Sequence, residues 1–235
     1  MRSLWLGRVD YGEALRLQRE LAARRIDGGI GDVLLLLEHP RTITLGRGAD
    51  RSNLLLSPED AASQGISICE VDRGGDVTWH GPGQLVGYPI IDLAAHRRDV
   101  HWYLRELEGA LVDTLCVFGI ESRRFPPHTG VWVGDRKIAA IGVKVSRWVT
   151  THGFALNVTA PAEEFSGIVP CGIRDYGVTS ILEVTGREFS LLEVAREGVR
   201  VFSRRFGNTA GPEGFPQGLL TAESEKILST ALDMA

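Results

Sequence analysis

Three extended segments in the middle of the chain follow one another with only tight turns between them. They cover residues 130–133, 138–145 and 149–158, and Gly134 and Asp135 separate the first two. Glycine next to aspartate favours a short hairpin turn, and strands joined in this way pair antiparallel. A parallel sheet built only from alternating strands and helices cannot contain such a hairpin. We therefore expect an α+β (mixed α/β) fold.

Helices are expected on either side of this hairpin region. Apolar residues recur at helical spacing over 12–25 and 100–118, and glycines follow both segments. Ser190 and Glu193 form a capping box that opens a last long helix, which runs to about Phe206. A proline after Ser57 predicts one more short helix.

Further strands are expected at 4–9, 33–37, 42–45, 67–71 and 85–93, with a glycine-rich loop over 73–84. No repeat or linker divides the chain, so we expect one domain over 1–235. Its last part, about 207–235, is expected to be a tail.

Charge and apolar content exclude several classes of function. A net charge of -4 and a pI near 5.9 lack the basic surface typical of nucleic-acid binding. No apolar stretch approaches the ~20 residues of a membrane span, and the N-terminal residues lack the apolar core of a secretory signal. The three cysteines have no CxxC spacing, so neither a disulfide framework nor a zinc site is expected. These features predict a cytoplasmic protein.

Cys171 is the cysteine whose surroundings favour reactivity. Pro170 and Gly172 flank it in a turn, whereas Cys69 and Cys116 lie in strand and helix patterns and are expected to be buried apolar residues. An ordinary cysteine has a pKa of about 8.5, so a nearby positive charge is needed to raise its thiolate fraction at neutral pH.

Three basic residues of the hairpin region could supply that charge: Lys137, Lys144 and His152. Their spacing does not choose among them. Lys137 differs in following a tight turn and leading into an apolar run, where its ammonium group could be partly desolvated.

The glycine-rich segment from Arg73 to Gln84 can bring backbone N–H groups close to a ligand. It matches neither a Walker loop nor a GxGxxG turn. The other histidines have no metal-ligand spacing and are expected at surface or capping positions: His39, His96, His101 and His128.

Four ordered motifs together resemble the lipoate biosynthesis octanoyltransferase family, the LipB type. They are RGGDVTWHGPGQLVGY from Arg73, RKIAAIG from Arg136, HGFALN from His152 and PCGIRDYGVTS from Pro170. The resemblance extends from about Leu4 to Phe206.

The resemblance implies a fold, a reaction and a set of residues. The fold is that of the biotin and lipoate ligase catalytic domain, a mixed sheet flanked by helices. The reaction transfers octanoyl from acyl carrier protein to the lipoyl-domain lysine of 2-oxoacid dehydrogenases or the glycine cleavage H protein. Cys171 matches the acyl-thioester cysteine and Lys137 the lysine that activates it. The matching substrate-binding residues are Arg73, Gly74, Gly75, Asp76, Val77, Thr78, Trp79, His80, Ala140, Ile141, Gly142, Gly153, Phe154 and Ala155.

Several expectations depend on this resemblance. Because the donor is already a thioester, neither ATP nor a metal or other cofactor is expected. Val77, Ile141 and Phe154 are the apolar candidates for an acyl pocket, and backbone N–H groups near the Cys171 turn are candidates for stabilising an oxyanion. Two alternatives remain: an ATP-dependent lipoate- or biotin-protein ligase of the same fold, and a non-catalytic module that binds a carrier or lipoyl domain.

Overall fold

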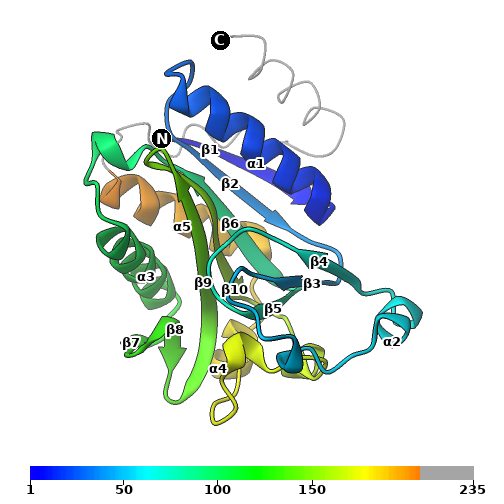
Figure 1. The fold of residues 1–235 in the computed structure, drawn as a ribbon. Coiled ribbons are helices and arrows are strands. Elements are labelled where there is room, and N and C mark those ends of the chain that lie inside the picture. Colours follow the sequence, from blue (N-terminus) through cyan, green and yellow to red (C-terminus); the bar gives the residue numbers. More distant parts are fainter. Residues whose placement is uncertain (207–235) are drawn as a thin grey trace.

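A seven-stranded mixed sheet forms the centre of the protein, in a computed structural model that describes residues 1–206 (Figure 1). Strands β1 and β2 are parallel and every other neighbouring pair is antiparallel. In order across the sheet, the strands are β1 (Arg2–Arg8), β2 (Val33–Glu38), β6 (Gln84–Ile90), β10 (Val149–Asn157), β9 (Arg136–Ser146), β8 (His128–Val133) and β7 (Arg123–Phe125). The expected hairpin is confirmed, since β8, β9 and β10 are consecutive antiparallel neighbours. The predicted mixed fold is confirmed with it.

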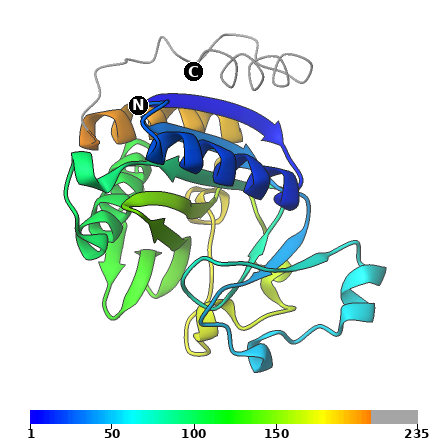
Figure 2. The same cartoon turned by 45° about the horizontal axis from the view of Figure 1, so that its top comes forward.

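Helices cover both faces of this sheet. Helix α1 (Tyr11–Ile26) buries Leu17 and Leu21 against one face, while α3 (Val100–Val117) and α5 (Leu191–Arg205) pack on the other (Figures 1 and 2). Two short helices, α2 (Pro58–Ser63) and α4 (Ile181–Thr185), lie outside these layers. The expected long helices are therefore present. Helix α1 covers one apolar face of the sheet, and α3 and α5 together cover the other.

The boundaries of α1 and α5 follow from their capping residues. The Asp10 side chain accepts hydrogen bonds from the first N–H groups of α1. At α5, the Ser190 side chain accepts from the Glu193 N–H, and the Glu193 carboxylate accepts from the Ser190 N–H. The predicted capping box is thus confirmed.

A second, three-stranded sheet lies beside the first, with strand order β4 (Ser67–Glu70), β3 (Thr42–Leu45) and β5 (Val77–His80). Strand β5 corrects the expectation of an uninterrupted loop over 73–84. Val77 and Trp79 are fully buried with Ile43, and Trp79 packs against Phe165. Glycines on both sides of this four-residue strand concealed its alternating pattern in the sequence.

Two expectations about single side chains were wrong. Cys116 is exposed and Cys69 is half-buried, so neither is a core residue. His39 is not at the surface: it is completely buried, and its two ring nitrogens make hydrogen bonds to the Val9 carbonyl and the Tyr88 hydroxyl, both at 2.7 Å. Sequence spacing could not show the Tyr88 contact, which joins β6 to the end of β2.

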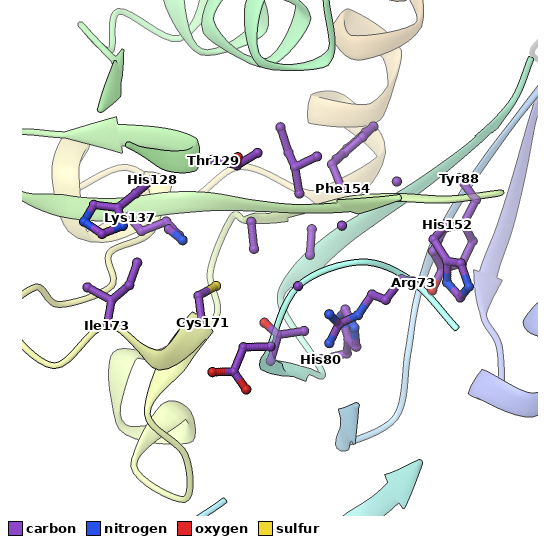
Figure 3. A pocket seen from close by; sticks show the side chains of 18 of the residues that line it. Arg73, His80, Tyr88, His128, Thr129, Lys137, His152, Phe154, Cys171 and Ile173 are labelled. Atoms are coloured by element: carbon purple, nitrogen blue, oxygen red, sulfur yellow. The ribbon is translucent and has the colours of Figure 1, made fainter. Parts of the chain in front are cut away.

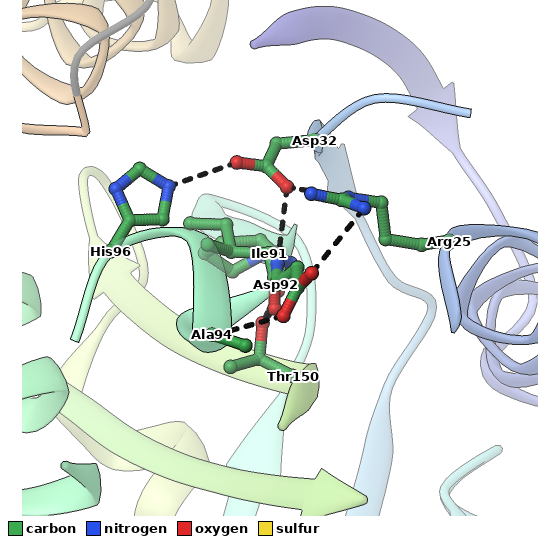
Figure 4. A network of polar contacts seen from close by, with 8 residues as sticks. Arg25, Asp32, Ile91, Asp92, Ala94, His96 and Thr150 are labelled. Atoms are coloured by element: carbon green, nitrogen blue, oxygen red, sulfur yellow. Dashed lines mark hydrogen bonds and ion pairs between the residues drawn. The ribbon is translucent and has the colours of Figure 1, made fainter. Parts of the chain in front are cut away.

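A buried carboxylate, that of Asp32, joins α1 to the sheet (Figure 4). Arg25 Nε donates to Asp32 Oδ1 at 2.8 Å, and His96 Nε2 lies 3.0 Å from Asp32 Oδ2. The Asp92 N–H also donates to Asp32. Burial by itself would raise the pKa of Asp32, but these hydrogen bonds, with that from Arg25 the largest, hold it below its usual range.

The predicted tail beyond residue 206 lies outside the described residues, and the single-domain boundary stays a prediction. Within residues 1–206, no helix has the length and apolar content needed to cross a membrane.

Candidate active site

A cavity of about 240 Å³ lies between β9 and β10 on one side and the glycine-rich segment with β5 on the other (Figure 3). Most of the residues predicted from the four motifs line it. They are Arg73, Gly75, Asp76, Thr78, His80, Ala140, Ile141, Gly142, Gly153, Phe154 and Ala155, together with Cys171 and Lys137. The structure therefore brings together segments that are separated by up to about a hundred residues in the sequence.

Three residues of the predicted substrate-binding set do not line the cavity. Val77 and Trp79 point into the core because side chains alternate along a strand, whereas Thr78 and His80 of the same strand point to the cavity. Gly74 lies against β9, where its N–H donates to the Val143 carbonyl. Val77 is therefore not part of an acyl pocket, while Ile141 and Phe154 do line the cavity.

Small residues keep the cavity open along β9 and β10. Gly142 pairs with Gly153 and Ala140 pairs with Ala155 across the two strands. A Cβ atom on Gly142 would lie 2.9 Å from the Gly74 carbonyl oxygen. The strands and the glycine-rich segment can therefore approach one another closely only because these positions carry little or no side chain.

The turn that carries Cys171 has an unusual backbone. Cys171 has φ 56 and Gly172 has φ 70, so two consecutive residues are left-handed. Asp76 holds this turn in place: Asn53 Nδ2 donates to Asp76 Oδ2 at 2.6 Å, and the Val169 N–H donates to the Asn53 carbonyl. The glycine-rich segment thus fixes the position of the cysteine as well as lining the cavity.

Lys137 is buried at the same end of the cavity as Cys171, and in Figure 3 the two side chains point toward one another. Its Nζ atom lies over the Trp132 ring, 5.0 Å from the centroid. Among the described residues no carboxylate forms an ion pair with Lys137, and the ammonium group instead makes a cation–π contact with the neutral indole ring.

The other two candidate bases lie elsewhere. Lys144 Nζ pairs with Asp72 Oδ2 at 2.7 Å and does not line the cavity. His152 lines the far end, where its Nε2 lies 2.8 Å from Asp72 Oδ1. Of the three, the structure places Lys137 beside the cysteine.

The far end of the cavity is polar, and it joins the predicted residues Arg73 and His80 to tyrosines that were not predicted. Arg73 is buried there, and its guanidinium donates to the backbone and side-chain oxygens of Thr44, both at 2.8 Å. Burial lowers the pKa of Arg73 and raises that of Tyr11 to about 12. The lining residues outside the predicted set are Tyr11, Tyr88, Pro127, His128, Thr129 and Ile173, together with His152, which was predicted only as a candidate base. Tyr11 comes from α1, which has no motif that could have marked it.

Chemically, the arrangement offers a cysteine and a buried lysine at one end of a partly apolar cavity. Such a pair suits nucleophilic acyl transfer. Within residues 1–206 no group of three or more His, Cys, Asp or Glu side chains could hold a metal ion.

Comparisons with known proteins agree with this chemistry. Residues 10–203 match the family described as the lipoyl protein ligase A/B catalytic domain. The chain is 55% identical over 201 residues to an octanoyltransferase of Solibacter usitatus, covering 86% of this chain and 90% of the relative. It is 52% identical over 204 residues to an octanoyltransferase of Rubrobacter xylanophilus, covering 86% and 91%. A solved lipoate protein ligase of Thermoplasma acidophilum has a similar fold, with a TM-score of 0.66 at 16% identity over 99% and 92% of the two chains.

Proposed function

Because this chain belongs to the lipoyl protein ligase A/B catalytic domain family and is an octanoyltransferase, we propose that Cys171 carries the octanoyl group as a thioester between donor and acceptor. Lys137 is the proposed proton carrier. The observation that carries the proposal is the position of Cys171 and Lys137 at one end of a cavity (Figure 3), whose wall continues along the paired small residues Ala140 and Ala155.

The first half-reaction moves the acyl group onto the enzyme. The Cys171 thiolate attacks the carbonyl carbon of the donor thioester, a new C–S bond forms, and the bond to the donor sulfur breaks. Lys137 gives a proton to the departing thiolate and becomes a neutral amine. One thioester replaces another, so this step needs no ATP.

The second half-reaction forms the amide. The acceptor lysine, with an ordinary pKa of about 10.4, arrives mainly as an ammonium ion. Neutral Lys137 takes one proton from it, and the resulting amine attacks the acyl carbon on Cys171. The C–S bond breaks as the C–N bond forms, Cys171 returns to a thiolate, and the second nitrogen proton passes to solvent.

Lys137 is also the better candidate for stabilising the oxyanion of each tetrahedral intermediate. The N–H groups that follow Cys171 are already engaged, since Gly172 donates to the Val169 carbonyl and Ile173 donates to the Pro170 carbonyl. The expectation that these backbone groups form an oxyanion hole is therefore replaced by a role for the Lys137 ammonium group.

Lipoyl domains are the acceptors that the family implies, and among them we propose those of 2-oxoacid dehydrogenases and the glycine cleavage H protein. The proposed donor is octanoyl-acyl carrier protein.

The test is the mass of the protein after it is mixed with octanoyl-acyl carrier protein in the absence of ATP. We expect a gain of one octanoyl group, which is lost when a lipoyl domain is added. Cys171→Ala should show no gain, whereas the matched Cys116→Ala and Cys69→Ala variants should behave like wild type. Normal turnover by Cys171→Ala would refute the covalent intermediate.

A further inference from the structure

The cavity changes character along its length. Cys171 and Lys137 lie at the reactive end, and Ala140 and Ala155, which pair across β9 and β10, line an apolar middle. The Phe154 ring points toward α5, where it stacks on Phe202 (Figure 3). The opposite end, here called the inner polar end, is formed by Arg73, Tyr11, Tyr88, His80 and His152. The strand register agrees with this order, because His152 pairs with Val143, six residues from Lys137 along β9, or about 20 Å of extended chain.

Arg73 places a buried positive charge at this inner polar end. Within the described part of the chain, no carboxylate lies within salt-bridge distance of Arg73, and its Nε atom is buried without a hydrogen-bond partner. The guanidinium donates to Thr44 and to the Gly74 carbonyl, but its Nε–H group is buried without a partner.

The inner polar end is also held rigidly. The guanidinium is fixed by two hydrogen bonds to Thr44 and by a third to the Gly74 carbonyl at 3.1 Å. His152 is held by Asp72, and its N–H donates to the buried Gln18 side chain at 2.7 Å. Neither Arg73 nor His152 can turn away to make room for an apolar chain without losing these bonds.

From this arrangement we infer that the inner polar end sets the acyl-length limit of the enzyme, through the Arg73 charge rather than through a closed apolar floor. The inference rests on the proposed function, in which the acyl chain extends from Cys171 along the apolar middle. Each methylene that enters the apolar middle is stabilised by burial. A longer chain would place apolar methylenes against the buried Arg73 guanidinium, whose Nε–H group has no protein partner, and this is strongly unfavourable.

The first test replaces the charge while keeping a long, flexible side chain. Arg73→Met should raise kcat/KM for a dodecanoyl donor relative to an octanoyl donor by at least about tenfold, since removing an uncompensated charge is worth more than one factor of ten. The matched variant Arg73→Lys keeps the charge and should retain the wild-type ratio. An unchanged ratio in a folded Arg73→Met protein would overturn the inference.

The second test uses the wild-type protein, so it stands even if Arg73→Met does not fold. A twelve-carbon donor that ends in a carboxylate should react at least about tenfold faster than dodecanoyl, because its charge complements Arg73. A steric floor would reject both donors equally, and that result would also overturn the inference. Failure of octanoyl to label Cys171 would instead count against the proposed function itself, so the two failures can be told apart.

Discussion

Gly172→Ala should impair the enzyme by moving Cys171, although the glycine itself contacts no reacting atom. Gly172 has φ 70, and an added Cβ atom would lie 2.6 Å from Asp76 Oδ2. A left-handed alanine costs about 1 kcal/mol. Moving Asp76 aside would break its hydrogen bond from Asn53, which is worth about 1.5–3 kcal/mol for a charged acceptor. A total of about 2–4 kcal/mol therefore falls on the turn that carries Cys171.

A matched control is available in Gly186, which ends α4 with φ 65 and would place a new Cβ atom in open space. Gly186→Ala should lower the free energy of unfolding by about 1 kcal/mol and leave acyl transfer unchanged. Gly172→Ala should slow acyl-enzyme formation by about tenfold to a hundredfold, because small displacements of a reacting group have effects of that size.

The assay follows the octanoyl mass gain on Cys171 in a single turnover, with urea unfolding of the same samples. If Gly172→Ala formed the acyl-enzyme at the wild-type rate, the turn would not need its left-handed glycine or its contact with Asp76. Equal activity losses in Gly172→Ala and Gly186→Ala would show that general destabilisation, and not the position of the cysteine, caused the effect.

Three further predictions concern charged groups. Lys137→Met should slow acyl-enzyme formation at neutral pH at least about tenfold, whereas the control Lys144→Met should not. Equal rates for the two variants in the mass assay would reject Lys137 as the group that activates Cys171. Burial lowers the pKa of His39 to about 4, so the unfolded chain takes up a proton first and His39 should contribute a fall of roughly 3 kcal/mol in the free energy of unfolding between pH 6.5 and 4. Burial lowers the pKa values of His80 and His152 as well, so urea titrations of His39→Gln should show a fall smaller by about that amount, and an unchanged fall would contradict this account. Burial alone would raise the pKa of Asp32, but its hydrogen bonds, above all the one from Arg25, hold this pKa below its usual range. The stability gained in this way is present above about pH 3.9 and is lost as pH falls through the folded-state pKa of Asp32. Arg25→Met should therefore move the acid-unfolding midpoint to higher pH, and an unmoved midpoint would contradict this account.

The sequence by itself determined the local elements of this protein. The capping box at Ser190, the hairpin turn at Gly134 and the apolar spacing of the long helices depend on residues close together in the chain, so their effects can be recognised without tertiary contacts. The same holds for Cys171, since the proline and glycine on either side of it already indicate a turn.

Strand β5 shows where local pattern was insufficient. Four residues between glycines carry too little alternation to be recognised, and the strand is stabilised by β3, more than thirty residues earlier in the chain. Tertiary packing also decided which of its side chains face the cavity. Trp79 belongs to the core, although the motif that contains it resembles a substrate-binding segment.

The choice of basic partner for Cys171 also required the tertiary structure. From spacing alone, Lys137, Lys144 and His152 were equivalent, and Lys137 was favoured only by its position after a tight turn and by the family resemblance. Strand β9 runs along the cavity, with Lys137 near one end of the strand. Lys144 lies further along β9 and, like His152, is paired with Asp72. The inner polar end likewise combines side chains from α1, β5, β6 and β10 with Arg73 from the segment between β4 and β5. Its electrostatic properties depend on how deeply these side chains are buried and on which hydrogen-bond partners they lack. Neither can be read from the order of neighbouring residues.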